Sequence, residues 1–80
     1  MTEGRIIVTR AVGRGFKYVT DPPRMLGITM TVGQMADRIR YIQKELPGYS
    51  PVFVTEKDDD FDTVPLNDED MKAFRRYGFR

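Results

Sequence analysis

The chain has 80 residues, enough for one domain with a single small hydrophobic core. It contains no cysteine and no histidine, which excludes disulfides, thiolate metal sites and the commonest general base. Its 13 lysines and arginines nearly balance its 12 aspartates and glutamates, for a formal net charge of +1. No apolar run approaches the roughly 20 residues of a membrane span, and the N-terminus lacks a signal-peptide pattern. The sequence therefore predicts a soluble cytoplasmic protein with no membrane partner.

Two runs of β-branched and aromatic residues near the N-terminus predict a hairpin. They lie at residues 4–12 and 16–20 and contain the residue types that favour strands. The segment GRG at 13–15 suits a three-residue hairpin loop. Because side chains alternate along a strand, we expect a buried face with Ile6, Val8, Phe16 and Tyr18, and a solvated face with Arg5, Thr9 and Lys17.

The clearest helix signal lies at residues 31–46, TVGQMADRIRYIQKEL. Apolar residues recur there every three to four positions, which aligns them on one helix face. Thr31 and Gln34 have the spacing of a capping box, and Pro47 stops the helix. A helix of this length is not stable alone in water, so we expect it to pack on a sheet.

The segments beside this helix are less regular. Residues 24–30 are predicted as a connector in which apolar side chains plug the core, with a short extended segment as the alternative. Residues 52–55 predict a strand buried on both faces, and residues 61–64 alternate apolar and polar residues. We therefore expect these two segments to pair as a second, antiparallel hairpin.

A short C-terminal helix completes the prediction. Asn67 is a suitable N-cap, acidic residues fill the following turn, and Gly78 suits the position after the helix. The sequence thus predicts one α+β domain spanning residues 1–80, in the order ββαββα. Its small antiparallel or mixed sheet of two hairpins would carry the central helix on one face and the short helix at an edge.

Carboxylates are concentrated at residues 56–62, which include Asp58, Asp59 and Asp60. The segment lacks the alternating ligands, central glycine and closing glutamate of a calcium loop, so no metal site is assigned. A solvated hairpin loop explains these residues most simply. The alternative is a strip of carboxylates that imitates a nucleic-acid backbone or meets a basic patch on a partner protein.

The N-terminal hairpin carries a basic cluster with Arg10, Arg14 and Lys17 beside two aromatic residues. Such residues can hold phosphates and stack on bases. No RNA-recognition motif or phosphate-binding loop accompanies them, and a solvated turn explains them equally well. Nucleic-acid binding through this hairpin is therefore the second hypothesis. A third is a sponge that holds a small anionic nucleotide between hairpin and helix.

The C-terminal segment 74–80, FRRYGFR, has three aromatic residues and three arginines in seven positions. Both types are enriched at binding hot spots. We assign as partner-binding residues Phe74, Arg75, Arg76, Tyr77 and Phe79 of this tail, with Asp58, Asp59 and Asp60 of the acidic loop. The partner would be another protein or a second copy of the chain. The alternative is that the aromatic residues dock on the sheet and the arginines only stabilise the helix end.

Catalysis has little support in the sequence. The only serine is Ser50, and no histidine is present to activate it. We therefore predict a protein that is not an enzyme and has no cofactor.

The run TVGQMADRIRYIQKELPGYSPVFV at 31–54 resembles small accessory proteins of bacteriophages and prophages. In these, a TVG opening, an amphipathic helix, LP and PVxV follow in the same order. The resemblance covers about a third of the chain and implies no particular activity. Many such proteins bind and block a host enzyme or defence complex. The leading hypothesis is thus a non-catalytic binding protein that acts on a host protein in the host cytoplasm.

Overall fold

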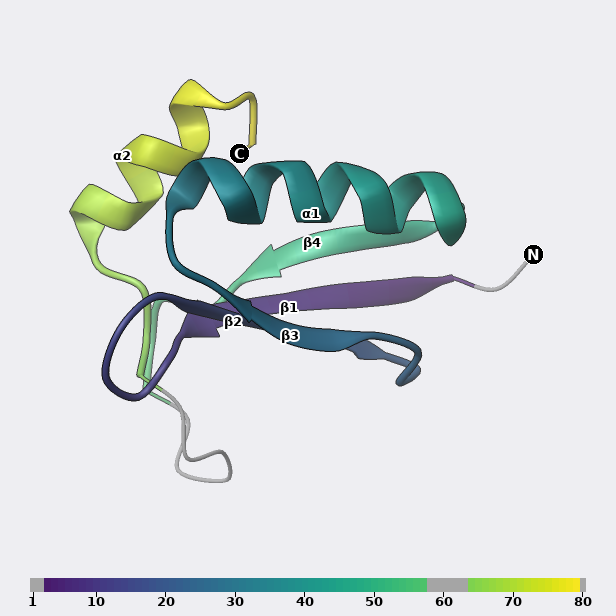
Figure 1. The fold of residues 1–80 in the computed structure, drawn as a ribbon, viewed down its shortest axis with the longest axis horizontal. Coiled ribbons are helices and arrows are strands. Elements are labelled where there is room, and N and C mark those ends of the chain that lie inside the picture. Colours follow the sequence, from purple (N-terminus) through teal and green to yellow (C-terminus); the bar gives the residue numbers. More distant parts are fainter. Residues whose placement is uncertain (1–2, 58–63, 80) are drawn as a thin grey trace.

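The computed structural model describes residues 3–57 and 64–79, which form a two-layer α+β unit (Figure 1). Its elements are β1 (Gly4–Arg10), β2 (Phe16–Asp21), β3 (Leu26–Thr29), α1 (Val32–Glu45), β4 (Tyr49–Phe53) and α2 (Asp68–Arg76). The four strands form one mixed sheet in the order β3-β2-β1-β4. Both helices lie on the same side of this sheet (Figure 1).

The α+β class is confirmed, but the order of elements is βββαβα and not ββαββα. The predicted connector contains β3, which pairs antiparallel with β2. β4 pairs parallel with β1, and among the described residues no strand lies between β4 and α2, so the predicted second hairpin with residues 61–64 is not part of the described sheet. Residues 61–63 of that segment lie outside the described residues, and Val64 makes a single antiparallel bridge to Arg10.

The parallel pairing of β4 follows from the path of the chain through α1. This helix connects β3 at one edge of the sheet to β4 at the opposite edge. β3 and β4 run in the same direction, because each is parallel to β1 by the observed pairings. A helical crossover is the usual connection between parallel strands.

The N-terminal hairpin agrees with the prediction on its core side. β1 and β2 are antiparallel with Val8 opposite Tyr18, and the four residues expected on this face, Ile6, Val8, Phe16 and Tyr18, are all buried. On the other face Arg5 and Lys17 are exposed. Thr9 is buried, so the expectation that this face is wholly solvated is wrong at that position.

The turn from β2 into β3 is organised by the buried hydroxyl of Thr20. Its Oγ1 accepts hydrogen bonds from the N–H of Arg24 at 2.6 Å and of Met25 at 2.9 Å. The N–H of Thr20 donates to the carbonyl oxygen of Met25 at 3.0 Å. One polar side chain therefore satisfies the backbone of the turn and directs the chain back along β2.

The helix α1 starts and packs as its sequence predicts. The Thr31 hydroxyl accepts from the N–H of Gln34 at 3.1 Å. The Gln34 side chain accepts from the N–H of Met30 at 2.9 Å, one residue earlier than in a standard capping box. The helix buries one apolar face against the sheet, formed by Met35, Ala36, Ile39 and Ile42.

The helix α2 is capped at both ends by local hydrogen bonds. Asn67 and Asp70 form a reciprocal capping box. At the other end Gly78 adopts a φ of 95°, its N–H donates to Arg75 O at 3.0 Å, and the N–H of Phe79 donates to Phe74 O at 3.2 Å. This pair of bonds is a Schellman motif. It turns the chain back so that Phe79 lies against the core.

Candidate functional site

The C-terminal tail, which the sequence assigned to partner binding, is largely used inside the molecule. The Phe74 side chain is fully buried, with its ring centroid 5.6 Å from that of Phe16 and 4.8 Å from that of Phe53. Phe79 packs partly buried against the same core. Phe74 therefore presents no surface to a partner. This agrees with the alternative that the aromatic residues of the tail dock on the sheet.

The rest of the tail is held along α1. Arg40 donates to the carbonyl oxygen of Tyr77, and its guanidinium lies 5.1 Å from the ring centroid of Phe79. Tyr77 keeps 45% of its surface exposed, and Arg75 and Arg76 are exposed. These three residues are the exposed part of the assigned tail, and Phe79 is partly buried.

The predicted phosphate-binding residues do not form one site. Arg10 Nη1 lies 3.4 Å from Asp70 Oδ2, and its guanidinium lies 6.0 Å from the Phe16 ring centroid on the helix side of the sheet. Lys17 is exposed on the opposite face, and Arg14 lies in the hairpin loop. The basic hairpin is thus divided between two faces. Asp58, Asp59 and Asp60 lie outside the described residues.

The sheet face turned away from both helices carries an apolar row. The strand register places one residue of each strand side by side across the sheet, in the order Leu26, Val19, Ile7, Val52. Leu26 is 75% and Val52 39% exposed, and the two central residues are partly buried. At the normal strand spacing the row is about 14 Å long. Among the described residues, no helix covers this face (Figure 1).

Charged and polar side chains border the apolar row on both sides. On one side Arg5 Nη2 lies 2.6 Å from Asp21 Oδ2. On the other side lie exposed Lys17 and buried Thr9, and beside Lys17 the apolar surface continues to Ile28, which is 62% exposed. An apolar centre with a mixed-charge border is the usual composition of a protein–protein interface.

The sequence patterns do not predict the apolar row, because they place Leu26 and Val52 in the core and leave Ile7 and Val19 on neither face of the hairpin. Leu26 was interpreted as a plug in a connector, and Val52 as part of a strand buried on both faces. The available signal was the consecutive apolar residues in β1, Ile6, Ile7 and Val8, and in β2, Tyr18 and Val19. Consecutive strand residues point to opposite faces, so these runs place apolar side chains on both faces of the hairpin.

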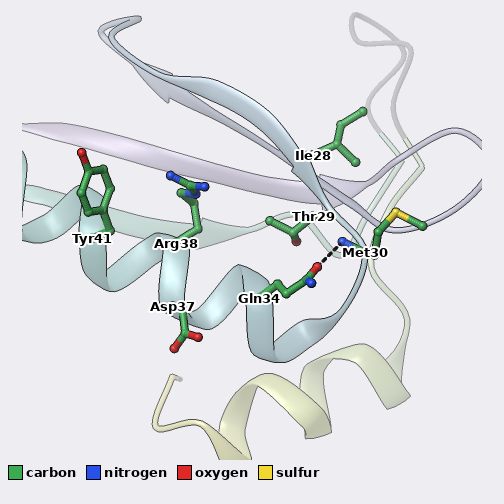
Figure 2. A pocket seen from close by; sticks show the side chains of 7 residues that line it. All are labelled: Ile28, Thr29, Met30, Gln34, Asp37, Arg38 and Tyr41. Carbon is green, nitrogen blue, oxygen red and sulfur yellow. Dashed lines mark hydrogen bonds between the residues drawn. The ribbon is translucent and has the colours of Figure 1, made fainter.

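A groove of about 480 Å³ lies between β3 and α1. Its lining consists of Ile28, Thr29, Met30, Gln34, Asp37, Arg38 and Tyr41 (Figure 2). Arg38 and Tyr41 are three positions apart on the helix, and the guanidinium lies 5.6 Å from the ring centroid. Figure 2 shows both side chains rising beside β3, with Asp37 directed to the other side of the helix.

Within 3–57 and 64–79, no three acidic side chains are placed to hold a metal ion together. None of the helices described is both long and apolar enough to span a membrane. No protein-family model, curated protein or solved structure matches this chain.

Proposed function

We propose that this chain is a non-catalytic binding protein that contacts another protein through the apolar row. The observation that carries the proposal is the continuous line of apolar side chains across all four strands, on a face that no described helix covers. Contiguous exposed apolar patches on small proteins mark interaction sites more often than scattered apolar residues do. The expected partner surface is apolar, with charges of both signs at its border.

The proposed partner is a host protein or complex. Binding of this chain would modulate or inhibit the action of that partner. The resemblance of residues 31–54 to phage-encoded accessory proteins supports this choice. The lack of cysteine and histidine supports a non-catalytic action, since binding alone needs neither residue. The proposed contact surface is the sheet and not the tail, because Phe74 and Phe79 pack in or against the core.

The test compares two lysine substitutions at exposed valines. Val52→Lys places a charge within the apolar row, and Val12→Lys places one in the hairpin loop, where the valine is 76% exposed. Both variants and the parent protein are immobilised and exposed to host-cell lysate, and bound proteins are quantified by mass spectrometry. We expect one or a few proteins to be retained by the parent and by Val12→Lys, and lost with Val52→Lys.

Two results would contradict the proposal. One is equal capture of every protein by all three forms, provided that circular dichroism shows them equally folded. The other is DNA or RNA binding that weakens steeply with salt and is lost in Arg14→Gln with Lys17→Gln, since steep salt dependence is typical of phosphate contacts. The second result would support the nucleic-acid hypothesis instead.

A further inference from the structure

Strand β3 lies at the edge of the sheet. Its register shows which of its residues point their backbone N–H and C=O groups away from β2. In an antiparallel pair, hydrogen-bonded and non-hydrogen-bonded residue pairs alternate. Thr20 is hydrogen-bonded to Met25 at 3.0 Å, so Gly27 also bonds to β2. Leu26 and Ile28 consequently direct their N–H and C=O groups away from β2. Among the described residues, no strand lies on that side of β3.

The two edges of the sheet differ in how well they are protected. Edge strands in native proteins usually carry proline or charged residues, which prevent pairing with another chain. β4 has such a residue: Val54 N–H donates to Val8 O, so by alternation Pro51 faces the open side, where it offers no N–H. β3 reads LGIT, with no proline and no charge. The edge at β3 is therefore the one that can accept another strand.

The surroundings of β3 indicate which side chains an added strand would carry. Side chains of such a strand would alternate between the groove and the open sheet face. The groove wall holds Arg38 and Tyr41, and Asp37 points away from them (Figure 2). Among residues 3–57 and 64–79, Arg38 takes part in no ion pair. On the open face, Leu26 and Ile28 present exposed apolar side chains.

We propose that β3 and the adjoining groove bind an extended segment of the partner protein as a fifth strand. This segment alternates acidic side chains, which enter the groove beside Arg38, with apolar side chains, which extend the apolar row past Leu26. Strand addition of this kind takes affinity from backbone hydrogen bonds and specificity from alternate side chains. The inference rests on the proposed function, because it names the part of the partner protein that is recognised.

A second copy of this chain fits the site less well. Paired edge to edge, the copy would direct Gly27 and Thr29 of its own β3 into the groove, because these residues lie on the helix side of the sheet. Neither carries a charge for Arg38. The groove would therefore keep an unmatched cation, whereas an acidic segment supplies the complementary charge.

The probes are two acetylated and amidated heptapeptides, one of alternating glutamate and valine and one of alternating lysine and valine. Each is titrated to millimolar concentration into isotope-labelled protein, and the backbone amides are followed by NMR. We expect the glutamate peptide to shift the amides of Leu26 and Ile28 and to slow their hydrogen exchange. Its Kd should be at least about 10-fold below that of the lysine peptide, because only one peptide complements Arg38.

Three substitutions separate backbone pairing from side-chain effects. Ile28→Pro removes an outward N–H without touching the bonds to β2 and should abolish the shifts, whereas Ile28→Val keeps the N–H and should preserve them. Arg38→Gln should remove most of the preference for the glutamate peptide. Circular dichroism confirms that each variant is folded.

The proposal is overturned if the amides of Leu26 and Ile28 do not respond, if the two peptides bind equally, or if Ile28→Pro binds as the parent does. Self-association would also overturn it, if the protein self-associates without peptide and Ile28→Pro abolishes this. A second copy of the chain would then occupy the edge. Lysate capture distinguishes this failure from failure of the proposed function. Capture that depends on Val52 but not on the Ile28 N–H leaves the function intact and removes only the added strand.

Discussion

Phe74 shows how a single side chain changes the interpretation of the tail. It is fully buried and contacts the rings of Phe16 and Phe53, while Tyr77 is nearly half exposed. Phe74→Ala should therefore lower the free energy of unfolding by about 3–5 kcal/mol, and Tyr77→Ala by less than about 1 kcal/mol. Urea denaturation of the two variants measures this difference. Similar values for both would mean that Phe74 is not a core residue.

Asp70 takes part in two interactions at once. Its Oδ2 accepts from the N–H of Asn67 at 3.0 Å and lies 3.4 Å from Nη1 of Arg10. Asp70→Ala should cost about 1–2 kcal/mol, mostly through the lost capping box. The Arg10 side chain is 36% exposed, so its coupling to Asp70 in a double-mutant cycle with Arg10→Gln should stay below about 1 kcal/mol. A larger coupling energy would show that the ion pair, and not the capping box alone, accounts for the cost of Asp70→Ala.

The elements that the sequence predicted well are those fixed by local chemistry. Thr31 caps α1 and Asn67 caps α2 through hydrogen bonds to residues three positions away, so a short window of sequence contains the whole signal. β3 and the parallel pairing of β4 depend on contacts between segments far apart in the chain. Gly27 also interrupts the apolar run that would have indicated β3. Local patterns could therefore not predict the order of the sheet.

The Schellman motif after α2 gives a prediction at the scale of an element. Gly78 has a φ of 95°, a conformation that costs a residue with a Cβ about 1–2 kcal/mol. Gly78→Ala should lower stability by that amount and speed hydrogen exchange at the Phe79 amide, which depends on this turn. Gly78→Asn is the matched control, because asparagine tolerates the left-handed region better. Equal costs for alanine and asparagine would contradict this explanation.

For the molecule as a whole, composition shows which residue types could bind a partner but not where in the fold they lie. Aromatic residues are enriched both in interfaces and in cores, and a small domain with one helical layer uses Phe74 and Phe79 for its core. The apolar row lies instead on the sheet and contains exposed aliphatic residues such as Val52 and Leu26. Only the register of four strands brings these into one row. The candidate site therefore could not be located before the strand order was known.

Because both ends of the apolar row are exposed, charges placed in it should affect dye binding more than stability. Replacing Leu26 and Val52 together by lysine should change the free energy of unfolding by less than about 2 kcal/mol, because Leu26 is 75% exposed and the lysine stem can keep part of the apolar contact of Val52. The same change should abolish binding of a hydrophobic fluorescent dye by the native protein, since it replaces both ends of the apolar row and leaves only the partly buried Ile7 and Val19. Val12→Lys, in the hairpin loop, should leave dye binding unchanged. A loss of stability above about 2 kcal/mol would mean that the apolar row is covered in the folded protein, and the sheet face could then not be the contact surface.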